Sequence, residues 1–104
     1  MKYRVDFLPK AERDMEDIEE YLSQFYPSTA RKLFEKMHEK ASMLEDLPYM
    51  CPAYEIDPDF RRMVIDDYLL FYTVNEEERM VDIHHIFRAS RDITSQMLTH
   101  GTIK

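Results

Sequence analysis

The spacing of apolar residues changes at Pro9 and again after Pro48, and these changes constrain the fold more than any other feature of the sequence. Residues 2–8 alternate between apolar and polar side chains, which is typical of a short, half-buried strand. Proline ends this strand and fits the first turn of a helix, because it lacks the amide proton that the first turn leaves unpaired. The chain is therefore expected to begin with a strand that leads directly into a helix.

Between these two prolines the apolar residues recur at steps of three and four, which predicts two amphipathic helices. Pro27 separates the two stripes, and the second runs from Ala30 to Leu47. Because the connection is short, the helices are expected to lie antiparallel as a hairpin. The acidic residues of the first helix form its outer face. Its apolar stripe consists of Ala11, Met15, Ile18, Tyr21, Leu22 and Phe25.

The second half of the chain is rich in β-forming residues. Residues 49–60 hold prolines among scattered aromatics, which predicts a loop with at most a short strand near residues 53–56. Two β-rich runs follow, separated by Asp66 and Asp67, and this pattern predicts a tight hairpin. The second run, residues 68–74, is apolar on both faces and is therefore expected to be a central strand.

A turn at residues 75–78 leads to a last strand over residues 79–87, and residues 90–102 are expected to form a short C-terminal helix. This order predicts one α+β domain over residues 1–104. An N-terminal strand precedes a two-helix hairpin, which packs on a twisted, mainly antiparallel sheet of about four strands. The sheet face away from the hairpin must be exposed, or covered by the C-terminal helix or a partner chain, and function is expected there.

Charge and composition restrict the classes of function. With 14 basic and 21 acidic residues the formal charge is −7, so general coating of nucleic acid is not expected. The single cysteine excludes an internal disulfide and a cysteine-based zinc site, and the single glycine excludes glycine-rich phosphate loops. We therefore expect no cofactor and no metal. No apolar run approaches the length of a membrane span or a signal core, so a cytoplasmic protein without a membrane role is expected.

The residues most able to do chemistry lie in the C-terminal half, which holds no lysine between Ala41 and Ile103. Arginine suits planar, bidentate contacts with phosphate, and histidine can transfer protons near neutral pH. Cleavage of RNA through its 2′-hydroxyl needs such a base, an acid and cations at the phosphate oxygens. The candidate catalytic residues are Arg61, Arg62, His84, His85, Arg88 and Arg91.

Strand geometry suggests different roles for the two histidines. In an alternating strand one of His84 and His85 faces the helices and the other faces away, and the register of the strand decides which. The inward histidine is interpreted as a hydrogen-bonded core residue, whereas the outward one is the candidate for proton transfer. Arg61 and Arg62 divide in the same way, and one of them could instead pair with a nearby aspartate.

Several segments together resemble the RelE/ParE superfamily of toxins from bacterial type II toxin–antitoxin (plasmid stabilisation) modules. They are Tyr3–Phe7, the two apolar helical stripes, Arg61–Val64, Tyr68–Tyr72 and Ile83–Asp92. The resemblance covers nearly the full length and implies a helical hairpin on a twisted antiparallel sheet. It also implies a cognate antitoxin whose disordered tail wraps the toxin as helix and strand, over a sheet face or edge. Homodimerisation is a further option.

The resemblance implies one of two activities: cleavage of ribosome-bound mRNA, as in RelE-like members, or inhibition of DNA gyrase by binding, as in ParE-like members. In the ribonuclease branch, Arg61 or Arg62 would contact the scissile phosphate and His85 or His84 would be the acid–base group. Arg88 or Arg91 lies where a C-terminal basic or aromatic residue is usual.

We expect a growth-arresting toxin, and favour a ribosome-dependent, metal-independent endoribonuclease because the histidines stand beside arginines. The alternative is a gyrase inhibitor, which would explain why acidic residues replace lysines before the hairpin and why no tyrosine follows Tyr72. A third hypothesis is a non-toxic, partner-binding module with the same fold, for which the acidic balance is the motive.

Overall fold

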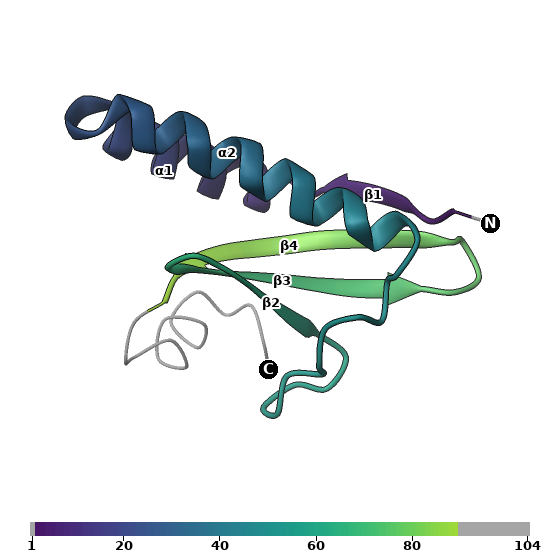
Figure 1. Cartoon of the computed structure of the whole chain (residues 1–104). Helices are drawn as coiled ribbons and strands as arrows, with labels where there is room; N and C mark the ends of the chain where they lie inside the picture. The colour runs from purple at the N-terminus through teal and green to yellow at the C-terminus, as the bar shows by residue number, and fades with distance from the viewer. Residues whose placement is uncertain (1, 90–104) are drawn as a thin grey trace.

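The computed structural model describes residues 2–89, and the helix expected at residues 90–102 lies outside them. The described chain begins with a strand, continues through two helices and ends with three strands (Figure 1). The elements are β1 (Arg4–Phe7), α1 (Pro9–Phe25), α2 (Pro27–Ser42), the short 3₁₀ helix η1 (Met43–Glu45), β2 (Arg61–Ile65), β3 (Tyr68–Asn75) and β4 (Met80–Arg88).

Both helices begin at a proline, as the missing amide proton of that residue predicts. They form the expected antiparallel hairpin, which lies over one face of the sheet (Figure 1). The regular part of α2 ends at Ser42, earlier than its apolar stripe suggested, and η1 carries the chain on to Glu45. Leu44 in this short turn is buried, whereas Leu47 is mostly exposed.

The sheet is mainly antiparallel, as predicted, with strand order β1-β4-β3-β2. The pairs β2–β3 and β3–β4 are antiparallel, and only β1 runs parallel to its neighbour, β4. The expected tight hairpin joins β2 to β3 through Asp66 and Asp67. Asp66 has a positive φ of 53°, a conformation that aspartate tolerates better than most residues. The strand β3 is central, as its apolar character on both faces predicted.

Two apolar cores lie on opposite faces of the sheet, and β3 contributes alternate residues to both. Leu70 and Tyr72 face the helices and pack with residues such as Met37. The far face carries a smaller aromatic cluster, in which Tyr54, Phe60, Leu69, Phe71 and Phe87 are buried together. Because β3 packs on both of its faces, it connects the two cores.

The far face of the sheet is covered in part by the loop that precedes β2. This segment passes from the helical layer to the other side of the sheet (Figure 1), where Tyr54 meets the Phe71 ring edge-on at 5.1 Å between centroids. The sequence analysis expected this face to be exposed, or covered by the C-terminal helix or a partner chain, and it did not foresee that the loop before β2 covers part of it. The short strand expected near residues 53–56 is only an isolated bridge between Ala53 and Arg61.

A cluster of side chains ties three segments together at the β3–β4 turn. The hydroxyls of Tyr3 and Tyr49 both donate hydrogen bonds to the carboxylate of Glu76. These bonds lower the pKa of Glu76 and raise that of Tyr3, and they are the main reason that the pKa of Tyr49 rises to about 12. The N-terminal strand and the loop before β2 are therefore both fastened to this turn.

Candidate functional site

An irregularity in β4 decides where the two candidate histidines point. Phe71 pairs with His85 and Tyr72 pairs with Ile83, so β4 contains one extra residue, His84, between these partners. Such a bulge shifts the alternation of side chains by one position. Both histidines consequently lie on the far face of the sheet, with ring centroids 6.2 Å apart. The expectation that one of them faces the helices is wrong, because it assumed unbroken alternation.

His84 is half-buried between the loop and β3. Its ring lies edge-on to Phe60, at 4.9 Å between centroids, and its Nε2 atom is 2.9 Å from the Thr73 hydroxyl. Burial lowers the pKa of this imidazole, although Asp82 on the same strand acts in the opposite direction. The neutral form is therefore favoured, which is the form a general base requires.

His85 is more deeply placed, with 8% of its surface exposed. Its ring stacks on Phe87 at 5.7 Å and lies beside Phe71 across the β3–β4 pair. The surrounding aromatic cluster restricts access of solvent to this imidazole. His85 thus has the environment of a packed residue, and a role in proton transfer stays a prediction.

Arg62 shares the far face with the histidines. It pairs with Phe71 on β3, which in turn pairs with His85 on β4, so the three form one row across the sheet. Two strand spacings separate Arg62 from His85, or about 10 Å between their backbones. The guanidinium of Arg62 lies 6.0 Å from the centre of the Tyr54 ring. Arg62 and His85 therefore lie on the same face of the sheet, on either side of the fully buried Phe71.

Arg61 lies on the opposite face, as alternation requires. Its Nη1 atom donates to the backbone carbonyl of Cys51 at 2.6 Å, and its guanidinium stacks over Tyr49 at 4.8 Å. These contacts fix the loop before β2 to the edge of the helix-side core. The structure therefore separates Arg61 from Arg62 and from the histidines, and it gives Arg61 contacts typical of a structural residue.

Arg88 is exposed at the end of β4, beside Tyr68 on β3, and Arg91 lies outside the described residues. Arg88 borders a groove of about 450 Å³ between the helical hairpin and the β2–β3 turn. Burial raises the pKa of Tyr68, and the charge of Arg88 partly offsets this effect. The remaining lining residues are Tyr21, Leu22, Tyr26, Thr29, Lys32, Leu33, Lys36, Asp66 and Asp67.

The hairpin end beside this groove carries three aromatic residues, of which Tyr21 and Phe25 belong to the apolar stripe of the first helix and Tyr26 follows it. Tyr21, Phe25 and Tyr26 are each more than half exposed, and their rings are in contact along the surface. The end of the hairpin where α1 meets α2 extends beyond the end of the sheet (Figure 1), so the strands cover this end only in part. A helical stripe predicts which residues share a face but not how far the neighbouring layer reaches. In the sequence, only the close spacing of aromatic residues before Pro27 indicated an exposed aromatic surface here.

Residues 2–89 offer neither a metal site nor a membrane-spanning helix. No group of three or more histidine, cysteine, aspartate or glutamate side chains in this part of the chain could hold a metal ion. None of the helices between these limits is long and apolar enough to cross a membrane. The candidate surfaces of the described chain are therefore the row on the far sheet face and the aromatic groove beside Arg88.

Comparison with solved structures supports the assignment of the fold. A chain of the chromosomal ParDE system from P. aeruginosa superposes with a TM-score of 0.72 and 17% identity, covering 86% of this chain and 98% of that one. A mutant of E. coli toxin RelE in the free state superposes with a TM-score of 0.67 and 17% identity, covering 96% of this chain and 98% of that one. A chain of the toxin–antitoxin complex RelBE2 of Mycobacterium tuberculosis superposes with a TM-score of 0.59 and 19% identity, covering 85% of this chain and 99% of that one. At such low identity, the likeness shows the fold alone.

Sequence comparisons extend this result to the family level. A search of curated proteins gives no significant match. The family model described as ParE toxin of type II toxin–antitoxin system, parDE, matches residues 5–93. This range is most of the chain and includes the hairpin, the strands β2 to β4 and all candidate residues. The chain therefore belongs to the ParE toxin family of type II toxin–antitoxin systems.

Proposed function

We propose that this toxin arrests growth in the cytoplasm by binding DNA gyrase, without a chemical step of its own. The observation that carries the proposal is the groove of about 450 Å³ beside Arg88, with the exposed aromatics of the hairpin end at its margin. Large, exposed aromatic patches on small proteins are typical of protein-binding surfaces. Tyrosine and arginine are also the residue types that contribute most to binding energy at interfaces.

The groove combines three kinds of contact in one place. Tyr21 and Tyr26 supply apolar area with a polar tip, Lys32 and Arg88 supply positive charge, and Asp67 supplies a carboxylate. Lys36 is engaged in an ion pair with Asp66 at 2.8 Å, which fastens the β2–β3 turn to α2. A partner could therefore dock against a preformed groove and lose little entropy by ordering it.

The two candidate arginines of β2 lie on opposite faces of the sheet, which supports inhibition by binding rather than catalysis of RNA cleavage. Arg61 is occupied by Cys51 and Tyr49 on the helix side, whereas Arg62 lies on the far side of the sheet. The formal charge of −7 also opposes approach to the dense phosphates of a ribosome. Membership of the ParE family agrees with a gyrase target, because inhibition of gyrase is the activity expected of ParE-like members.

A supercoiling assay with purified gyrase and stoichiometric toxin tests this proposal. Wild-type toxin should stop supercoiling, and a Tyr21→Ala/Tyr26→Ala variant should raise the half-inhibitory concentration by about tenfold or more, as for removal of hot-spot residues. Val64→Ala is the matched control, because Val64 is equally exposed but lies on the far sheet face. Unchanged supercoiling with a molar excess of folded toxin would exclude gyrase as the target.

A second candidate is ribosome-dependent cleavage of mRNA, which the row of Arg62, Phe71 and His85 on one face favours. Primer extension on a reporter mRNA after controlled expression tests it. New mRNA ends with wild type that disappear with Arg62→Ala and His85→Ala, but persist with Arg61→Ala, would support cleavage. Growth arrest without new ends would leave gyrase as the target.

The toxin is expected to have a cognate antitoxin as its partner. Structures of similar fold have been solved as toxin–antitoxin complexes, including RelBE of E. coli and RelE–RelB of Pyrococcus horikoshii OT3. We propose that the antitoxin of this chain neutralises it by covering the surface that meets the target. Co-expression of the neighbouring gene should restore growth, and its product should co-purify with the toxin.

A further inference from the structure

The groove beside Arg88 has the size of a small-molecule site as well as the character of a protein-binding surface. Its volume of about 450 Å³ lies in the range of about 300–1,000 Å³ that is usual for small-molecule pockets. The helical hairpin bounds it on one side, and the β2–β3 turn and the end of β4 bound it on the other. The groove can therefore hold a ligand of the size of a small cofactor.

Positive charge in this groove is only partly neutralised. Lys36 pairs with Asp66 at 2.8 Å between Nζ and Oδ1, so these two charges offset each other. Lys32 on α2 and Arg88 at the end of β4 also line the groove, and neither takes part in an ion pair within residues 2–89. Lysine binds phosphate as a point charge, and arginine binds it through parallel hydrogen bonds. The groove therefore offers two cations to an anionic group.

Three tyrosine rings line the groove together with these cations. Tyr21 and Tyr26 come from the end of the hairpin, and each is more than half exposed. Tyr68 pairs with Arg88 across β3 and β4, and its hydroxyl lies within electrostatic range of Arg88 and Tyr21. Burial raises the pKa of Tyr68, so this hydroxyl keeps its proton and can donate to an anion. Exposed tyrosine rings also provide faces on which a flat ring can stack.

Two carboxylates in the same place indicate that the ligand also carries hydrogen-bond donors. Asp67 lines the groove and lies close enough to Tyr68 to affect the pKa of its hydroxyl. Asp17 borders an adjoining hollow of about 280 Å³, which shares Tyr21 and Arg88 with the groove. An ionised carboxylate only accepts hydrogen bonds, and it repels an anion. A ligand that suits both charges has an anionic group at one end and hydroxyl or amino donors at the other.

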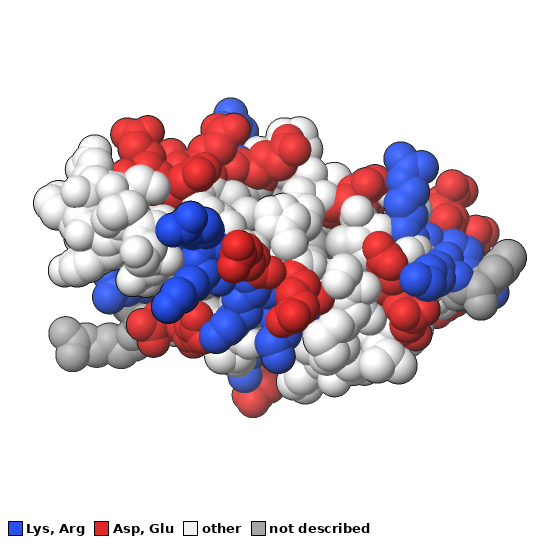
Figure 2. Space-filling view, turned by 45° about the horizontal axis from the view of Figure 1, so that its top comes forward, with Lys and Arg blue, Asp and Glu red and all other residues white. Residues whose placement is uncertain are grey.

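The surroundings of the groove limit the ligand to a small molecule. Figure 2 shows an uncharged surface at the end of the hairpin, with basic side chains beside it and acidic ones close by. The whole chain has a formal charge of −7. A nucleic-acid strand would extend beyond the two cations and meet this negative charge, whereas a single nucleotide would not.

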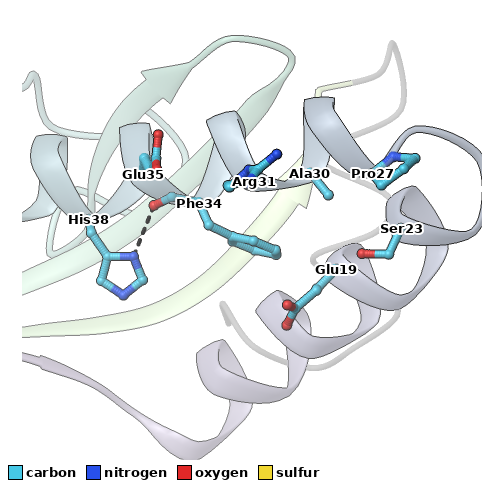
Figure 3. A pocket seen from close by; sticks show the side chains of 8 residues that line it. All are labelled: Glu19, Ser23, Pro27, Ala30, Arg31, Phe34, Glu35 and His38. Atoms are coloured by element: carbon cyan, nitrogen blue, oxygen red, sulfur yellow. Dashed lines mark hydrogen bonds between the residues drawn. The ribbon is translucent and has the colours of Figure 1, made fainter.

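The other groove of the hairpin has a different lining. It lies between α1 and α2, has a volume of about 530 Å³ and shares no lining residue with the groove beside Arg88 (Figure 3). Arg31 and the carboxylates of Glu19 and Glu35 line it, and none of the described residues around it is a tyrosine. Arg31 adjoins Lys32 in the sequence but lines this other groove, so it provides a matched control.

We propose that the groove beside Arg88 binds a nucleoside monophosphate. Lys32 and Arg88 hold the phosphate, the base stacks on the exposed tyrosines, and the hydroxyls of the ribose donate to the carboxylates. Such a ligand competes with gyrase for the same surface, and this regulatory consequence rests on the proposed function. Binding of the nucleotide itself does not depend on gyrase.

Isothermal titration calorimetry with adenosine monophosphate tests the site. We expect saturable binding that is at least about tenfold tighter than the binding of adenosine, inorganic phosphate or phenyl phosphate. Arg88→Gln should weaken nucleotide binding by about tenfold, whereas Arg31→Gln should change it by less than about twofold. Tyr26→Ala should also weaken it. Phe25→Ala should not, because this ring adjoins Tyr26 but does not line the groove.

Absence of saturable binding would overturn the proposal, as would equal losses in Arg88→Gln and Arg31→Gln. Equal affinity for inorganic phosphate would indicate a simple anion site, and equal affinity for phenyl phosphate would show that the nucleoside is not recognised. Either result would overturn the assignment of the ligand.

The supercoiling assay separates this proposal from the gyrase contact. Adenosine monophosphate, at a concentration that leaves gyrase alone unaffected, should raise the half-inhibitory concentration of the toxin. Unchanged inhibition at a saturating concentration of the nucleotide would exclude the shared surface. A toxin that binds the nucleotide but leaves gyrase active would refute the gyrase contact and retain the nucleotide site.

Discussion

The carboxylate of Asp14 on α1 accepts a hydrogen bond from the backbone amide of Ile86 on β4, with 3.0 Å between Oδ2 and nitrogen. The strand β1 ends opposite Ile83, so the next part of β4 has no strand on that side. Asp14 supplies the missing acceptor, and its other oxygen contacts Lys10. A helix side chain thereby completes the edge of the sheet just beyond the bulge.

Replacing Asp14 by alanine should destabilise the fold, because the buried amide of Ile86 would lose its acceptor. A hydrogen bond to a charged group contributes about 1.5–3 kcal/mol, and we expect the free energy of unfolding to fall by this amount. Urea denaturation measures it. Asp17→Ala, an exposed position on the same helix, should cost less than about 0.5 kcal/mol. Equal effects of the two substitutions would contradict the edge-completing role.

Replacing Phe71 by alanine should show that the far sheet face is a true core. This ring is fully buried between Tyr54 and Phe87, and such a substitution typically costs about 3–5 kcal/mol. Val64→Ala on the same face should cost less than about 0.5 kcal/mol, because Val64 is exposed. Thermal and urea unfolding compare the two. A small effect at Phe71 would mean that the loop does not pack on the sheet.

His84 should make the stability depend on pH in the mildly acidic range. Burial lowers its pKa below the ordinary value of 6.5, so the unfolded chain binds the proton more readily than the folded chain. The stabilisation from the neutral ring is complete above pH 6.5 and is lost as the pH falls through the folded pKa. The free energy of unfolding should therefore decrease between pH 7 and 5, and less steeply in His84→Gln. Parallel pH profiles for the two proteins would exclude His84 as the source.

Replacing Glu76 by glutamine should lower the pKa of Tyr49 from about 12 towards the ordinary value of 10. The charged acceptor holds the phenol in its protonated form, and a neutral amide does so less strongly. Alkaline titration of tyrosinate absorbance measures the change, and Tyr49→Phe identifies the transition. Glu77→Gln, in the same turn, should leave it unchanged. The hydrogen bonds also predict that the stabilisation from Glu76 is lost below pH 4.5, because they lower its pKa.

Much of the fold could be predicted from local patterns. The prolines at the start of both helices, the aspartate pair between β2 and β3 and the apolar character of β3 each reflect a short-range preference of the backbone or of burial. A strand such as β3 has to be central because both of its faces need cover. These inferences needed no knowledge of distant contacts, which is why they agree with the structure.

The candidate site was less predictable, because it depends on which face of the sheet each strand residue occupies. One extra residue at His84 moved both histidines to the same face, and only the step of three between the buried Ile83 and Ile86 indicated it. Arg62 joined them while Arg61 did not, because the pairing of β2 with β3 set which side each occupies. A pattern of residue types does not contain this information.

The sequence alone determined the order of strands and helices, since periodicity and proline act over a few residues. The tertiary structure decided which side chains meet. It brought Asp14 to Ile86 across 72 positions, laid Tyr54 over Phe71 and left Tyr26 exposed beyond the end of the sheet. Such contacts follow from how far each layer extends and where a strand is interrupted, and both are settled only when the layers pack.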